Sequence, residues 1–125
     1  MNKDNNDLIK FILPEFIHKD DRGMLKQITS KGKWSQVNYI ESDIGSTRGN
    51  HYHKINRELF YIIDGKFMLT LELNDHKMVY EIIANDLFVI EPMVKHSFDF
   101  KEKTRLISMY DKGVELENGQ MDILL

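Results

Sequence analysis

Short β-rich runs separated by turn residues fill most of this 125-residue chain, and helical periodicity is hard to find in it. Asp64-Gly65 stands between two apolar runs and is a strong hairpin signal. The predicted strands are Ile9–Leu13, Phe16–His18, Gly23–Ile28, Ser35–Glu41, Glu58–Asp64, Lys66–Leu73, Met78–Ile83, Leu87–Glu91, His96–Phe100 and Thr104–Tyr110. About ten short strands at near-regular spacing predict an all-β fold, a small antiparallel β-barrel or jelly roll.

Composition narrows the class of protein. With 42% apolar residues, the chain can build a core, and we predict one domain over residues 1–125 with residues 1–7 disordered. A net charge of −3 offers no basic surface for nucleic acid or membrane. The absence of cysteine excludes disulfides and thiolate chemistry. Because the sequence has no apolar run of about 20 residues and no signal peptide, we expect a cytoplasmic protein.

The stretch GSTRGNHYHKINRELFYIIDG, residues 45–65, is the most informative for function. It spaces two glycines, two histidines and a glutamate as G-x5-H-x-H-x4-E-x6-G. Side chains alternate along a strand, so His51 and His53 should point to the same side. The alternative is that these histidines lie on the solvent-exposed surface and have no function. The full spacing followed by an apolar run favours a pocket.

The histidines and the glutamate of this stretch, together with His96 further along the chain, suit a metal ion. His51, His53 and His96 would each supply a nitrogen and Glu58 an oxygen, a ligand set for one divalent ion. Zinc is our first choice, with iron, manganese or nickel as alternatives. A buried Glu58 needs a partner, and a cation would satisfy it.

The five motif positions Gly45, His51, His53, Glu58 and Gly65 resemble the first conserved motif of the cupin superfamily. The segment 85–96, with Pro92 and His96, resembles its second motif. This resemblance implies a cupin barrel over about residues 19–110.

A finer resemblance points to sugar-processing cupins of bacterial surface-polysaccharide biosynthesis. RGNHYHK with the following glutamate looks like the C-terminal cupin of capsular-polysaccharide epimerase/reductases, which carries zinc and acts on UDP-linked sugars. DRGML and VNYI, at residues 21–25 and 37–40, look more like WxcM-like ketoisomerases, which act on dTDP-4-keto-6-deoxyhexoses without needing a metal. The implied activity is an isomerase or epimerase of a nucleotide-linked 4-keto-6-deoxy sugar.

Such an enzyme needs a base, a stabiliser for the enediolate and an acid. His51 or His53 would take the proton beside the ketone, and Tyr39 would return it. Arg48 could pair with the nucleotide diphosphate, and we assign Asn38 to substrate binding with it.

Two other functions use the same residues. One is a metal-dependent cupin of another kind, such as a dioxygenase, and the other is a non-catalytic sugar-binding cupin. Since cupins commonly pair through their N-terminal strands, the apolar segment LIKFILPEF also predicts a homodimer.

Overall fold

The computed structural model describes residues 6 and 8–125, and its secondary structure in this part is strand and turn. The strands are β1 (Ile9–Phe11), β2 (Phe16–Asp20), β3 (Gly23–Gln27), β4 (Gln36–Ser42), β5 (Thr47–His51), β6 (Glu58–Asp64), β7 (Lys66–Leu73), β8 (His76–Ile83), β9 (Leu87–Ile90), β10 (Lys95–Phe100) and β11 (Thr104–Tyr110). Among the described residues, no helix has the length and apolar character needed to cross a membrane.

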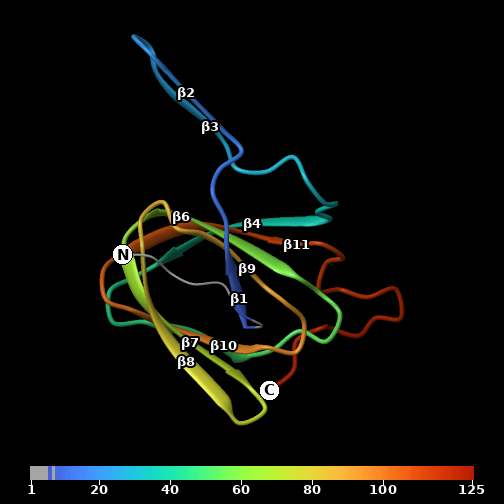
Figure 1. Ribbon diagram of the computed structural model, residues 1–125. Coiled ribbons are helices and arrows are strands. Elements are labelled where there is room, and N and C mark those ends of the chain that lie inside the picture. Colours follow the sequence, from blue (N-terminus) through green and yellow to red (C-terminus); the bar gives the residue numbers. More distant parts are fainter. Residues whose placement is uncertain (1–5, 7) are drawn as a thin grey trace.

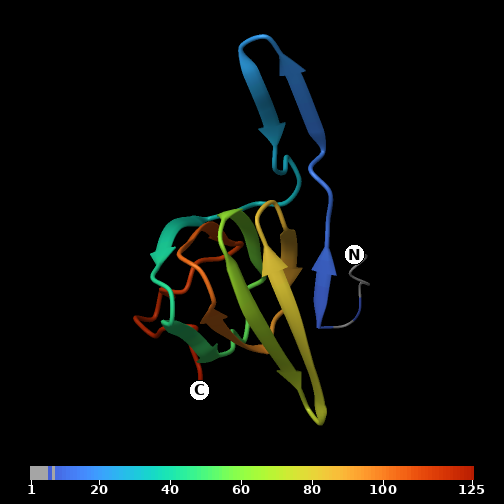
Figure 2. The same cartoon turned by 90° about the vertical axis from the view of Figure 1, so that its left-hand side faces the viewer.

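Two antiparallel sheets form the barrel (Figure 1). The first sheet has the order β1-β9-β6-β11-β4 and the second has the order β5-β10-β7-β8. Figure 2, turned by 90°, shows β7 and β8 as the long strands on one side of the barrel. The predicted all-β cupin barrel is confirmed.

The core lies between the two sheets and follows the alternation of the strands. In β10 every second residue is buried, so that Phe98 and Phe100 continue the face that begins with His96. Phe60 of β6 stacks on Phe88 of β9 with ring centroids 5.0 Å apart. Burying each of these rings stabilises the fold by about 1.5–3 kcal/mol. The aromatic core thus extends directly from the side chain of His96.

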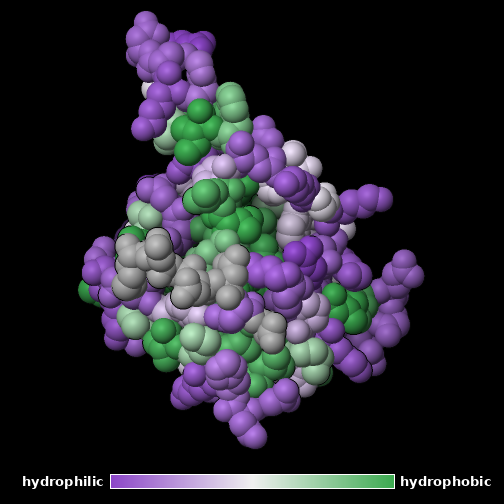
Figure 3. Space-filling model, in the orientation of Figure 1, coloured by the Kyte–Doolittle hydropathy of each residue, from purple (hydrophilic) through white to green (hydrophobic). Residues whose placement is uncertain are grey.

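The hairpin of β2 and β3 projects from the barrel as an arm (Figures 1 and 2). Its exposed apolar side chains are Phe16, Ile17, Met24 and Leu25. In Figure 3 the tip of the arm is hydrophilic, and hydrophobic side chains lie nearer the barrel. A two-stranded hairpin is at best marginally stable alone, so this arm needs a surface to pack on.

Most predicted strands agree with the structure, and β6, β7 and β11 have the predicted bounds. β5 was not among the predicted strands, because its residues Thr47–His51 are polar and include a glycine. This strand exists because β10 pairs with it. At Gly49, a Cβ would lie 2.7 Å from the carbonyl oxygen of His96, so only glycine fits this approach.

The disorder predicted for residues 1–7 falls outside the described residues, except for Asn6. The Asn6 side chain donates to the Tyr80 hydroxyl at 2.7 Å and accepts from the Leu8 amide at 2.8 Å, so this residue is anchored. The boundaries of a single domain over 1–125 stay a prediction.

Candidate functional site

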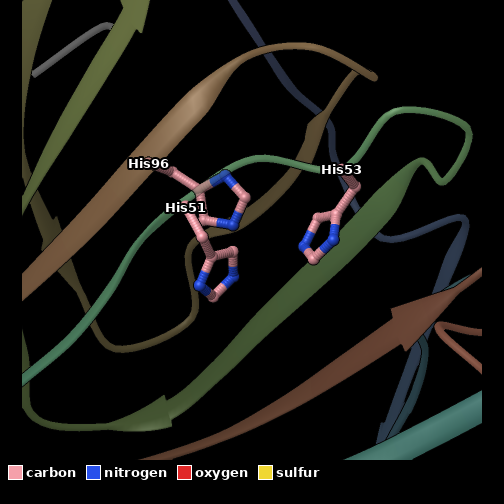
Figure 4. Close-up of side chains that lie close together, drawn as sticks. All are labelled: His51, His53 and His96. Atoms are coloured by element: carbon pink, nitrogen blue, oxygen red, sulfur yellow. The ribbon is translucent and has the colours of Figure 1, made fainter. Parts of the chain in front are cut away.

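Three histidine rings meet inside the barrel (Figure 4). The ring centroid of His51 lies 5.0 Å from that of His53 and 4.8 Å from that of His96. The centroids of His53 and His96 are 5.1 Å apart. One nitrogen from each ring lies within 4.8 Å of the others, close enough for one ion or one substrate group to touch all three. We call these residues the histidine cluster.

Strand pairing and a sharp bend of the backbone position His51. It ends β5 directly opposite His96 of β10, so both side chains project from neighbouring strands. The two residues before it, Gly49 and Asn50, have φ of 84° and 61°. This left-handed stretch, together with the register shift after His96, turns the end of β5 toward the interior.

His51 and His53 do not share one strand, contrary to the prediction from their spacing. β5 ends at His51, and His53 lies beyond it in a loop. Two contacts hold His53 there: its carbonyl accepts from the Met93 amide at 2.7 Å, and its Nδ1 bonds the carbonyl of Asp122 at 2.7 Å. The rings still converge, but the loop aims His53 and strand alternation does not.

Backbone carbonyls fix the tautomers of two cluster rings. Nδ1 of His53 donates to the Asp122 carbonyl, and Nδ1 of His96 donates to the Val94 carbonyl at 3.0 Å. A carbonyl can only accept, so Nδ1 carries the hydrogen in both rings. In the neutral rings Nε2 therefore carries no hydrogen, and its lone pair can bind a metal or accept a proton.

Glu58 completes the buried part of the site. Its Oε1 lies 3.2 Å from Nε2 of His53 and 3.6 Å from Nε2 of His96. All three atoms are buried, and none of them forms a hydrogen bond with the described residues. Three lone pairs that face one another repel, and leaving them unsatisfied is costly. A shared proton or a divalent cation would satisfy them. The three histidines fit the predicted metal ligands, and Glu58 lies against two of them.

The cluster histidines differ in basicity. Burial, followed by the neighbouring His96 and His53, lowers the pKa of His51 to about 4. Burial also lowers the pKa of His96 to about 4. Burial would lower the pKa of His53 too, but the Glu58 carboxylate and the Asp122 contacts outweigh it and raise this pKa. At neutral pH, His51 is thus a free base beside the ring that most readily holds a positive charge.

Tyr110 also reaches this site, and the sequence analysis did not select it. Its ring centroid lies 4.9 Å from that of His53, and across the sheet it pairs with Glu58. Burial and then the Glu58 carboxylate raise the pKa of Tyr110, so the phenol keeps its proton. The alternation along β11 places it on the buried face with Leu106 and Ser108. This alternation was the only feature of the sequence that indicated an inward position for Tyr110.

Tyr39, which we predicted as the acid, does not lie at the cluster. It faces outward from β4, its side chain is 57% exposed, and its hydroxyl donates to Glu41 at 2.7 Å. It pairs with Ile107, one position out of phase with the buried residues of β11. The predicted catalytic role of Tyr39 is therefore not supported by its position.

The two predicted substrate-binding residues lie on nearby strands without touching the cluster. Asn38 is half-buried on the inner face of β4, where its amide donates to Ser108 Oγ at 3.5 Å. Arg48 of β5 donates from Nε to Ser42 Oγ at 2.6 Å and from Nη2 to the Glu41 carbonyl at 3.1 Å. Both bridge neighbouring strands in this structure, and their binding of substrate stays a prediction.

Comparisons with known proteins agree with this architecture. The QdtA 3,4-ketoisomerase from Thermoanaerobacterium thermosaccharolyticum, solved with TDP, is 26% identical, with a TM-score of 0.69 over 82% of this chain and 79% of that chain. The WlaRB TDP-quinovose 3,4-ketoisomerase from Campylobacter jejuni is 15% identical, with a TM-score of 0.74 over 91% and 92% of the two chains. At this identity it shows the fold alone.

A third structure is longer than this chain. The capsular polysaccharide assembling protein CapF from Staphylococcus aureus is 22% identical, with a TM-score of 0.65 over 88% of this chain and 32% of that one. This chain thus matches about a third of CapF, and the likeness again shows only the fold.

Family membership comes from the sequence itself. No curated protein matches the chain. Residues 18–110, which run from the arm to the end of β11 and include the whole histidine cluster, match the family model described as the polysaccharide biosynthesis C-terminal domain. The chain therefore belongs to the polysaccharide biosynthesis C-terminal domain family.

Proposed function

We propose that this protein is an isomerase or epimerase of a nucleotide-linked 4-keto-6-deoxy sugar in bacterial surface-polysaccharide biosynthesis. Its family is one of polysaccharide biosynthesis, and the ketoisomerase QdtA shares its fold at 26% identity. The observation that carries the proposal is His51, a half-buried neutral imidazole beside the buried contact of His53 Nε2 with Glu58 Oε1, which are 3.2 Å apart. A neutral base next to a site that holds positive charge is what proton transfer beside a ketone requires.

The ketone makes the hydrogen on the neighbouring carbon acidic. His51, the most exposed cluster ring, would take this proton while the electron pair moves to the ketone oxygen and forms an enediolate. His53, whose pKa is raised, would stabilise the oxygen with its positive charge. Tyr110 replaces Tyr39 as our candidate for the acid because its protonated phenol lies beside His53.

Return of the proton decides the product. Delivery to the opposite face of the same carbon inverts it and gives an epimer. Delivery to the former ketone carbon, with loss of the proton of the neighbouring hydroxyl, moves the ketone by one position. Both outcomes conserve atoms and electrons, so the reaction needs no redox partner.

Deuterium wash-in tests this function. The protein is incubated in D₂O with a panel of dTDP- and UDP-linked 4-keto-6-deoxy sugars, and the products are read by mass spectrometry and NMR. We expect deuterium on one carbon and a new isomer for one substrate, and loss of both with His51→Ala. If every sugar in the panel stays unlabelled, the proposed activity is wrong.

A bound divalent metal is the alternative form of this proposal, and in that form the His51 nitrogen that binds the metal is not the base. His51, His53, His96 and Glu58 would hold it, because the buried lone pairs of His53, His96 and Glu58 have no other partner among the described residues. Zinc is the first candidate. When bound, it would act as a Lewis acid on the ketone oxygen. The same ligands would equally suit another metal-dependent cupin, such as a dioxygenase, which would consume oxygen and not exchange deuterium.

A homodimer is also proposed, and the projecting arm supports it. The arm exposes four large apolar side chains on a hairpin that has few contacts with its own barrel (Figure 3). A second copy would cover them. A cytoplasmic location, where nucleotide-activated sugars are made, stays a prediction.

A further inference from the structure

The chain that follows β11 closes around the loop that carries His53. After β11 it turns back toward the second sheet (Figure 1). Tyr52 and Leu124 exchange backbone hydrogen bonds of 2.9 and 3.0 Å. Asn56, which is almost fully buried, donates to the carbonyl of Gly113 at 2.8 Å. The loop 52–57 is thus built against the segment 111–124 at several points.

Asp122 is the anchor of this contact. Its side chain is buried, and its carboxylate accepts hydrogen bonds from the backbone amides of Lys54, Ile55 and Asn56 at 2.8, 3.1 and 3.1 Å. The Asn56 side-chain amide adds a bond of 2.8 Å. Burial would raise the pKa of Asp122, but these four donors outweigh it and lower the pKa. A carboxylate that gathers three successive amides defines the course of the loop.

The backbone of the same residue orients His53. The Asp122 carbonyl accepts from Nδ1 of His53 at 2.7 Å, and the Asp122 amide donates to the Val114 carbonyl at 2.8 Å. The side chain therefore shapes the loop after His53 while the main chain holds the ring. Together they direct Nε2 of His53 toward Oε1 of Glu58, 3.2 Å away.

We propose that Asp122 is a positioning residue of the active site: its carboxylate clamps the loop 54–56 so that its carbonyl holds His53 with Nε2 directed into the histidine cluster. Its role in activity rests on the proposed function. Asp122 lies beyond residues 18–110, the part that matches the family model. The clamp is thus supplied by the segment after β11, outside the residues that the family model matches.

The test compares the wild type with Asp122→Asn. This variant keeps the shape of the side chain but places an NH₂ group among the N–H donors that converge on the carboxylate. Substitution of partners behind a functional histidine typically costs 10–100-fold, so we expect kcat to fall about 10–100-fold with KM changed by less than about threefold. We also expect the ¹⁵N spectrum of His53, assigned with His53→Gln, to change from one tautomer to a mixture. The spectrum is recorded as purified and after treatment with a chelator.

Two further variants separate positioning from folding. Asn56→Ala removes the side-chain donor to the Asp122 carboxylate but leaves Asp122 itself in place, and it should give a smaller change in the same direction. Ile82→Val trims the core on β8, where Ile82 pairs with Phe67 well away from His96, and should lower the melting temperature without changing kcat or the tautomer.

The outcomes are distinct. If Asp122→Asn stays folded with a wild-type His53 spectrum and wild-type kcat, the clamp is not a positioning device. If Asp122→Asn does not fold, Asn56→Ala decides, and a wild-type His53 spectrum in that variant overturns the proposal. If the wild type itself lacks activity on all sugars, the proposed function fails, while the tautomer measurement still tests the clamp.

Discussion

Nε2 of His53 lies 3.2 Å from Oε1 of Glu58, and neither buried atom forms a hydrogen bond within the described chain. His53 donates from Nδ1 to a carbonyl, so its Nε2 presents a lone pair to a carboxylate oxygen. Such a contact is stable only when a positive charge lies in it, either as a proton on the ring or as a cation bound to both atoms. The charge at this contact is therefore part of the site.

Replacing Glu58 with glutamine should separate stability from function. The amide of Glu58→Gln can donate to a lone pair of His53 or His96, so the melting temperature should stay equal or rise. Activity and zinc content should fall by about 10–100-fold, because the negative charge is gone. The matched control is Glu81→Gln on the exposed face of β8. A glutamine variant with full activity would show that the carboxylate charge is unnecessary.

Replacing His51 and His53 together with alanine should abolish metal binding and deuterium exchange while leaving a folded barrel. Both rings belong to the histidine cluster, whereas the core is formed by other residues. After chelation, added zinc should raise the melting temperature of the wild type but not of the double variant. The control replaces the exposed His18 and His76 with alanine. Equal zinc by elemental analysis in wild type and double variant would contradict the ligand assignment.

Tyr110→Phe and Tyr39→Phe distinguish the two candidate acids. Tyr110 lies beside His53 and Glu58, whereas Tyr39 bonds Glu41 on the outer face. We expect kcat to fall at least about 100-fold for Tyr110→Phe, as for loss of a general acid, and to change less than about twofold for Tyr39→Phe. Rates on the substrate found by wash-in measure both. The reverse ranking would return the role to Tyr39.

The outward position of Tyr39 has a physical cause. In β4 the outward face carries Val37 and Tyr39, while the inward face carries Asn38 and the buried Ser42. Hydrophobic periodicity would assign the more apolar side to the interior. Near a polar site the interior needs groups that hydrogen-bond, such as Ser42 with Arg48, and the pattern reverses. Strand positions were predictable here, but which face turned inward was not.

Other elements and contacts differ in how far the sequence predicts them. The bounds of β6 and β7 were predictable because Asp64-Gly65 joins two strongly apolar strands. β5 has no such signal and depends on pairing with β10, a contact between distant parts of the sequence. The bond from His53 to Asp122 spans 69 positions, and no local pattern indicates it. The local pattern thus selected the residues of the histidine cluster but not the groups that orient them.

The exposed apolar side chains of the arm predict a dimer. Substituting Phe16 and Leu25 together with serine should convert the proposed dimer to a monomer, because these side chains, 51% and 59% exposed, would lose their apolar contacts with the second copy. Molar mass from light scattering measures this. The control Val79→Ser removes an equally exposed apolar residue from β8 and should stay dimeric. A monomeric wild type would refute the dimer.

The two motif glycines should differ in how much they tolerate alanine, although both have positive φ, 83° at Gly45 and 102° at Gly65. A Cβ at Gly45 would meet no atom within 4 Å. Only backbone strain should therefore act there, and it should lower the free energy of unfolding by about 1–2 kcal/mol. At Gly65 a Cβ would collide with Thr104 Oγ1 and lie 2.6 Å from the Lys103 carbonyl oxygen. This overpacking should cost about 1–3 kcal/mol more. Urea unfolding measures both variants, and equal losses would mean that β11 moves aside to make room.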